Sequence, residues 1–366
     1  MSSEQIHDSF FCLLRLGLWE AATEPVDSFF PLSAQQWEKV FQLAVKQTVE
    51  GVLFEGVNKL PVALHPPKTL LLRWTVRVDA IERRNNWMNK IIAAQVRFFK
   101  TQNIHPILLK GQGLARCYPN PNVRVCGDID WYVESKKNSK ALFSMFQKQG
   151  LKPEAQAGFS FSFLWNNCDT EIHQRLLDLH NPFVKSFLKR LEKKEQLNRI
   201  TLQVGEESVF LPSALLTYVQ VNAHILKHLL SFGIGIRQLC DSARICFQYA
   251  HVIDGEELRQ VYRKLGILKW IDLLHMLLVK YIGLEATSLP FPLPKNGQAD
   301  WMMKEILVAG NFGFHDDRVD LAREDQTNQR VDSFKRWKNN FRRYIAYAPQ
   351  ETIFFPLVQF YSRFVK

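Results

Sequence analysis

Residues 127–133, with the sequence GDIDWYV, constrain the fold most, because polar and apolar side chains alternate there. Side chains of a β-strand point alternately to opposite faces, so a strand places Asp128 and Asp130 together and Ile129 and Trp131 on the other face. Two neighbouring carboxylates repel each other unless a positive group lies between them. Such hard oxygen ligands suit Mg²⁺. For this motif alone, a solvated strand edge is an equally good interpretation.

A third carboxylate is expected from a predicted strand over residues 170–175. Glu171 and His173 share one face of that strand. If the two strands are neighbours, Asp128, Asp130 and Glu171 form a metal site. One ion would bind an acceptor hydroxyl, and a second would hold a triphosphate and steady the leaving pyrophosphate.

A glycine-containing turn follows a predicted buried strand over residues 104–109. Backbone N–H groups at the start of a helix favour anions, and Gly111 and Gly113 allow a phosphate to approach closely. Lys110 adds a positive charge, and Arg124 adds a planar group that can bind phosphate oxygens. The alternative is a tight strand-to-helix turn with no ligand.

The rest of the chain is organised around this segment. We predict an N-terminal helical region over residues 1–100, an α/β core over 101–211 and a C-terminal helical domain over 212–366. The fold class is therefore α+β, with a small mixed β-sheet flanked by helices. The predicted strands cover residues 104–109, 128–134, 159–165, 170–175, 199–204 and 208–211.

Composition narrows the class of protein but not its partner. The formal net charge of +11 favours polyanions such as nucleotides, RNA, phospholipid or an acidic protein. The six cysteines form no CxxC pair, which predicts reduced thiols and a cytoplasmic protein. No secretory signal is expected at the N-terminus, and no membrane span is expected anywhere in the chain.

Five short motifs occur together in one order and spacing. They are Leu108-Leu109-Lys110-Gly111, Tyr118-Pro119-x-Pro121, Arg124, Gly127-Asp128-Ile129-Asp130 and Glu171-x-His173. In combination they resemble the uncharacterised nucleotidyltransferase family of the polymerase-β-like nucleotidyltransferase superfamily. The resemblance implies a nucleoside triphosphate and Mg²⁺ at the edge of a small sheet, as two ions, with Mn²⁺ as the alternative. It assigns the metal to Asp128, Asp130 and Glu171.

The same resemblance extends more weakly over residues 223–241. It implies that His224 and Arg237 line a cleft above the nucleotide and that Asp241 is a base on the acceptor side. A salt bridge to a nearby arginine is the alternative for Asp241. The implied substrate-binding residues are Lys110, Gly111, Gly113, Arg124, Gly127, His173, His224 and Arg237. Trp131 and Tyr132 replace a smaller aliphatic pair, which we expect to alter packing rather than chemistry.

The leading hypothesis is transfer of a nucleotidyl group from ATP or another triphosphate to an acceptor hydroxyl, with release of pyrophosphate. The acceptor would be a small molecule, a sugar or a protein side chain. A nucleic-acid-modifying transferase is the first alternative, supported by basic and aromatic residues over 333–347. The second is a non-catalytic module that binds a nucleotide or a partner.

Overall fold

The computed structural model describes residues 3–21, 24–156, 159–231, 233–295, 297–311, 338 and 340–362. Within them, seven strands form one mixed sheet in the order β3-β4-β5-β2-β1-β7-β6. The strands are β1 (Ile107–Leu109), β2 (Ile129–Tyr132), β3 (Glu154–Gln156), β4 (Ser160–Trp165), β5 (Cys168–His173), β6 (Ile200–Val204) and β7 (Glu207–Leu211).

Helices surround this sheet. The helices up to residue 148 are α1 (Ser3–Leu18), α2 (Val26–Phe29), α3 (Ala34–Lys46), α4 (Glu50–Asn58), α5 (Lys68–Thr101), α6 (Gly111–Ala115) and α7 (Lys136–Lys148). The later ones are α8 (Lys185–Glu195), α9 (Ala214–Ser231), α10 (Ile236–Tyr249), α11 (Gly255–Leu265), α12 (Leu268–Leu277), α13 (Asp300–Ala309) and α15 (Pro349–Ser362). The α+β class and the flanked mixed sheet that the sequence predicts are confirmed.

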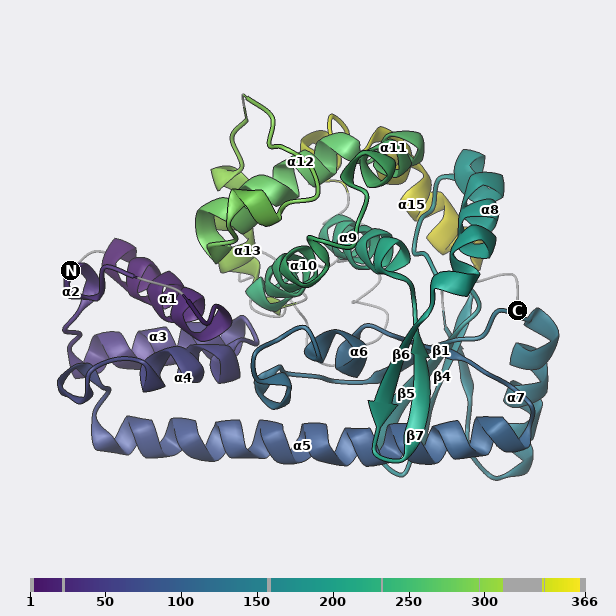
Figure 1. The fold of residues 1–366 in the computed structure, drawn as a ribbon, viewed down its shortest axis with the longest axis horizontal. Helices are drawn as coiled ribbons and strands as arrows, with labels where there is room; N and C mark the ends of the chain where they lie inside the picture. Colours follow the sequence, from purple (N-terminus) through teal and green to yellow (C-terminus); the bar gives the residue numbers. More distant parts are fainter. Residues whose placement is uncertain are drawn as a thin grey trace.

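Helix α5 runs along one side of the molecule, beneath both the N-terminal helices and the sheet (Figure 1). Its last turns carry Met88, Ile92 and Phe99 on one face, at helical spacing. These side chains share an apolar cluster with Trp131 and Ile172, from the neighbouring strands β2 and β5. Burying this cluster holds one face of the sheet against α5.

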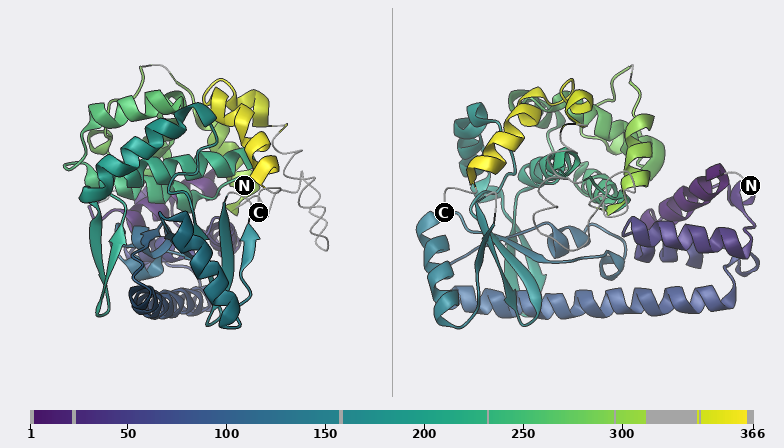
Figure 2. Two further views of the ribbon diagram at one scale, coloured as in Figure 1. Left: turned by 90° about the vertical axis from the view of Figure 1, so that its right-hand side faces the viewer. Right: turned by 180° about the vertical axis from the view of Figure 1, so that it is seen from behind.

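Helices that follow residue 212 lie on the opposite side of the molecule from α5 (Figure 2). The first of them, α9, begins after Ser213, whose hydroxyl accepts a hydrogen bond from the backbone N–H of Leu216. Among the described residues, no helix combines the length and the apolar character that crossing a membrane requires. Two of the four aromatic residues proposed to support nucleic-acid binding, Phe334 and Trp337, lie outside the described residues.

Strand β2 is the element that positions the predicted acids. It pairs in parallel with β5, so that Asp130 lies opposite Glu171, and antiparallel with β1 on its other side. The strand is shorter than predicted, since Asp128 precedes its first residue. Strand β3 was not predicted, because all three of its residues are exposed and no apolar alternation marks it. The predicted domain boundaries remain predictions.

Candidate functional site

A cavity lies where the sheet, the start of α6 and helices α9 and α10 meet. Most of the predicted site residues line it, from both the core and the C-terminal helices: Lys110, Gly111, Arg124, Gly127, Asp128, Asp130, Glu171, His173, His224, Arg237 and Asp241. Sequence reasoning missed Ser160, Asp178 and Lys227, which also line it. Asp178 lies beyond the end of β5 with no motif around it, so only the fold brings it to the cavity.

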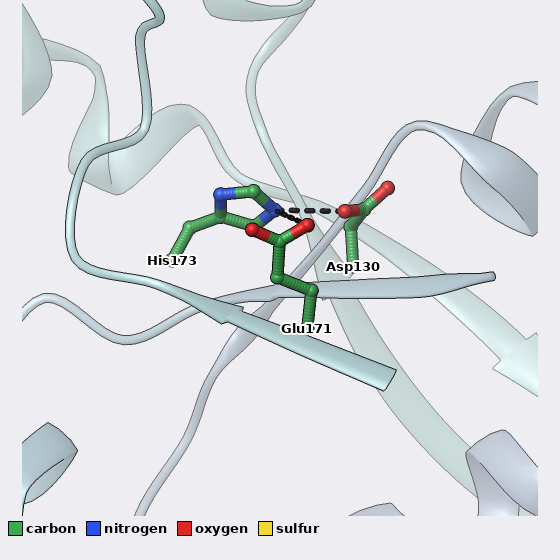
Figure 3. A group of neighbouring side chains, drawn as sticks. All are labelled: Asp130, Glu171 and His173. Atoms are coloured by element: carbon green, nitrogen blue, oxygen red, sulfur yellow. Dashed lines mark hydrogen bonds and ion pairs between the residues drawn. The ribbon is translucent and has the colours of Figure 1, made fainter. Parts of the chain in front are cut away.

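Three side chains from β2 and β5 meet in what we call the Asp-Glu-His cluster: Asp130, Glu171 and His173 (Figure 3). One potential ligand atom from each lies within 4.8 Å of the others. His173 Nε2 is 2.7 Å from Asp130 Oδ1 and 3.6 Å from Glu171 Oε2. Ser160 on β4 donates a hydrogen bond to Glu171. The parallel register of β2 and β5 produces this meeting, because it sets Asp130 beside Glu171.

Charge within the cluster is strongly coupled. Burial by itself would raise the pKa of Asp130, but Lys110, whose Nζ lies 3.3 Å from Asp130 Oδ2, and His173 hold that pKa well below its usual range. Burial opposes the charged form of His173, yet its hydrogen bond to Asp130 and the nearby acids raise the pKa of this imidazole. Asp130 is therefore an anion held between the Lys110 ammonium and the His173 imidazole.

Asp128 lies at the entrance of the cavity and is exposed. The negative charge of Asp130, and next the partial loss of water around this carboxyl within the cavity, raise the pKa of Asp128 to about 6. Lys110 and Arg237 counteract this rise only in part. A raised pKa caused mainly by a neighbouring carboxylate indicates that the local positive charge does not offset both acids.

Lys110 and Gly111 form the turn between β1 and α6, and both have a positive φ, of 43° and 39°. The α6 helix that follows is only five residues long, so it provides a weaker anion site than the sequence suggested. Gly113 does not line the cavity. A Cβ atom there would lie 3.0 Å from the Leu211 side chain. Packing therefore explains this glycine, in place of the predicted contact with phosphate.

Arg124 and Asp241 form a buried ion pair across the cavity wall. Arg124 Nε and Nη2 donate to the two carboxylate oxygens of Asp241, each at 2.7 Å. The Tyr118 hydroxyl donates to the same carboxylate at 2.7 Å. Both partners of the pair are almost fully buried. This geometry favours the salt-bridge alternative for Asp241 over a base role, and it engages the arginine that was expected to bind phosphate.

The histidines of α9 belong to a second hydrogen-bonded group. His224 Nδ1 lies 3.0 Å from Asp178 Oδ2, and His224 Nε2 lies 2.9 Å from His228 Nε2. Lys227 Nζ is 3.2 Å from the same Asp178 oxygen. Burial first, and then Lys110, lower the pKa of His224 to about 4, so this imidazole is neutral at pH 7.

Arg237 on α10 donates from Nη1 to the backbone carbonyl of Val125 at 2.6 Å. Its charge lowers the pKa of Asp128, which places its positive end near the cavity entrance.

The Asp-Glu-His cluster has the chemistry of a divalent cation site. Carboxylates suit Mg²⁺ and Mn²⁺, and an imidazole nitrogen suits Mn²⁺ and other transition metals better than Mg²⁺. The compact spacing of the three donors fits one ion. The residues present therefore fit a bound cation, although they do not identify it.

Comparison with known proteins agrees with the motifs. No curated protein matches the chain. The structure is similar to the crystal structure of an antigenic nucleotidyltransferase-like protein from Paracoccidioides brasiliensis, with 14% sequence identity and a TM-score of 0.33, over 54% of this chain and 92% of that one. A likeness at this score carries no argument. Residues 33–283 match the family described as uncharacterised nucleotidyltransferase, and this match spans more than half of the chain. The chain therefore belongs to the uncharacterised nucleotidyltransferase family.

Proposed function

We propose that this protein transfers a nucleoside monophosphate from a nucleoside triphosphate to an acceptor hydroxyl and that it requires Mg²⁺ or Mn²⁺. The observation that carries the proposal is the Asp-Glu-His cluster, which lies with Asp128 in a cavity of a chain from a nucleotidyltransferase family. In the reaction, the acceptor oxygen bonds to the α-phosphorus. The bond from that phosphorus to the bridging oxygen breaks, pyrophosphate leaves with the electron pair, and the hydroxyl proton passes to water.

Asp130, Glu171 and His173 would hold the cation, and Asp128 at the entrance would add a further carboxylate. A bound divalent cation supplies positive charge against the negative charge that develops on the phosphoryl oxygens and the leaving group. Lys110 supports this role, since its ammonium beside Asp130 keeps that carboxylate ionised.

Positive side chains on the cavity wall would bind the triphosphate. Lys110 and Arg237 reach the cavity from the sheet side and from α10. Lys227 reaches it from α9, beside the neutral His224, whose two ring nitrogens already bond to Asp178 and His228. Arg124 contributes indirectly, because its pairing with Asp241 ties the core to α10. The cavity thus combines acids on the sheet with cations around them, as binding of a cation and a polyanion together requires.

The test incubates the protein with each α-labelled triphosphate, with and without Mg²⁺ or Mn²⁺, in the presence of cell-extract components. We expect cation-dependent transfer of label and release of pyrophosphate. Asp130→Asn should lower the transfer rate by about 10³-fold, since it removes a charge that the reaction depends on.

Asp79→Asn is the matched control, because Asp79 is an exposed acid on α5 paired with Arg83. It should transfer label at the wild-type rate. Thermal melts of all three proteins separate lost chemistry from lost folding. Transfer that persists in Asp130→Asn, or the absence of any nucleotide transfer by the wild type, would overturn the proposal.

A further inference from the structure

Gln95 is a polar residue on the apolar face of α5. It continues the helical series of Met88, Ile92 and Phe99 that packs against the sheet, and its side chain is fully buried. Burying an amide costs free energy unless its donors and acceptor find partners. A leucine would pack at such a position without that cost, so the bonds made by this amide need an explanation.

The amide bonds to both strands that carry the Asp-Glu-His cluster. Trp131 Nε1 on β2 donates to Gln95 Oε1 at 2.7 Å. Gln95 Nε2 donates to Thr170 Oγ1 on β5 at 2.9 Å. An indole N–H can only donate, so the amide oxygen must face Trp131 and the NH₂ group must face Thr170. Trp131 and Thr170 are almost fully buried, so water does not replace either bond.

These two partners are the sequence neighbours of the metal-site acids. Trp131 follows Asp130, and Thr170 precedes Glu171. In the parallel register, Asp130 pairs with Glu171, whereas Trp131 pairs with Ile172 and Thr170 with Ile129. The amide therefore spans the two strands diagonally on the face opposite the acids. A slip of one residue would turn either acid to the wrong face and break a bond to Gln95.

We propose that Gln95 is a positioning residue that holds β2 and β5 in the register and spacing that bring Asp130 and Glu171 onto one cation. This inference rests on the proposed cation site. Gln95 touches neither the cation nor the nucleotide. It acts through Trp131 and Thr170, from a helix that passes beneath the sheet (Figure 1).

The test measures Mn²⁺ affinity by electron paramagnetic resonance of the free ion, beside thermal melts of the metal-free proteins. Gln95→Met keeps the length of the side chain and removes the amide. We expect about 10-fold weaker Mn²⁺ binding, the range seen when groups that orient metal ligands are lost. Thr170→Val removes one bond without changing shape and should weaken binding by a smaller factor, about threefold.

Phe146→Leu is the matched control for general loss of stability. Phe146 is a fully buried residue of the same apolar cluster, and its ring packs against the rings of Phe98, Phe161, Phe163 and Trp165. It should lower the melting temperature at least as much as Gln95→Met and leave Mn²⁺ affinity within about twofold of the wild type.

A triple variant combines Gln95→Met with Trp131→Phe and Thr170→Val. It distinguishes the effect of Gln95 on the position of the acids from the cost of leaving its buried partners without a hydrogen bond. It leaves no orphaned partner, so it should recover stability relative to Gln95→Met while its Mn²⁺ affinity stays low. Equal affinity in wild type and Gln95→Met, or affinity losses that follow the melting temperature in every variant, would overturn the positioning role. A wild type that binds Mn²⁺ no better than Asp130→Asn would instead remove the cation site on which the inference rests.

Discussion

The cavity has a sheet wall, formed by β2 and β5, and a helical wall, formed by α9 and α10. Both walls carry acidic side chains, but the partners of these acids differ. On the sheet wall, Asp128, Asp130 and Glu171 are crowded, and the pKa of Asp128 is raised to about 6 chiefly by Asp130. On the helical wall, Asp241 of α10 has a bidentate arginine and a tyrosine, and Asp178, which follows β5 and faces α9, has a histidine and a lysine. Each acid of the helical wall has a cationic partner, whereas on the sheet wall Lys110 and His173 serve Asp130, and positive charge offsets the repulsion at Asp128 only in part.

This difference separates acids that could bind a cation from acids that stabilise the fold. A cation would relieve repulsion on the sheet wall and would only compete with existing bonds on the helical wall. Carboxylates that line one cavity are therefore not equivalent, and residue type alone does not distinguish them. Four experiments test this contrast between the two walls.

The largest effect is expected from replacing one acid on each wall. Glu171→Gln should lower nucleotide transfer by about 10²- to 10³-fold, because it removes charge from the proposed cation site. Asp178→Asn, the same chemical change within the same cavity, should lower it by less than about 10-fold, because Asp178 serves His224 and Lys227. Steady-state transfer rates check both. Equal losses in the two variants would erase the distinction between the walls.

Stability should show the opposite pattern. Asp241→Asn leaves the Arg124 charge buried without its partner, so the free energy of unfolding should fall by about 3 kcal/mol. Asp128→Asn should change it by less than about 1 kcal/mol, because the acid is exposed and its main interaction is repulsive. Urea denaturation of the metal-free proteins measures both values. A larger loss of unfolding free energy in Asp128→Asn would contradict the conclusion that the acids of the helical wall are the ones that stabilise the fold.

Acidity should control cation binding to the sheet wall. Asp128 has a pKa of about 6 and the pKa of His173 is raised above its ordinary value, so both are largely protonated at pH 5 and must release protons to bind a cation. Mn²⁺ affinity should therefore rise by at least about 10-fold from pH 5 to pH 7. In Asp128→Asn, Mn²⁺ affinity should rise less steeply with pH, because only His173 then has to release a proton. An unchanged slope would exclude Asp128 from the cation site.

A smaller effect tests whether a raised pKa alone marks a functional acid. Burial raises the pKa of Glu192, on α8 and outside the cavity, to about 7. The folded protein thus holds this proton more tightly than the unfolded chain, and the wild type loses stability as pH rises from about 4.5 to 7. The difference in unfolding free energy between Glu192→Gln and the wild type should shift in favour of the variant by about 1 kcal/mol from pH 4 to pH 8, after allowance for solvent screening.

Chemical denaturation at the two pH values measures that gain. Nucleotide transfer should stay at the wild-type rate, because Glu192 hydrogen-bonds Tyr132 and does not line the cavity of the Asp-Glu-His cluster. A large loss of transfer would show that the site extends beyond the cavity described above.

Local patterns in the sequence were enough to predict six of the seven described strands and to assign the side chains around Asp130 and Glu171 to faces. Alternation around Asp130 and around Glu171 predicts which side chains share a face, because the two-residue period of a strand depends only on its own backbone. The cap at Ser213 is equally local, because its hydroxyl accepts a hydrogen bond from an N–H three residues along the chain. Motif spacing then led to the family that the comparison confirms.

Partners distant in the chain could not be predicted in this way. Arg124 and Asp241 are 117 positions apart, and Asp178 and His224 are 46 apart. The role of Gln95 depends on α5 packing behind two strands that follow it in the chain. The sequence alone indicates that Asp130 faces away from Ile129 and Trp131 and that Glu171 shares a face with His173, because backbone geometry sets the direction of each side chain locally. Which acids are already neutralised depends on the distant cations that folding brings within hydrogen-bond distance, so that property follows from the tertiary structure.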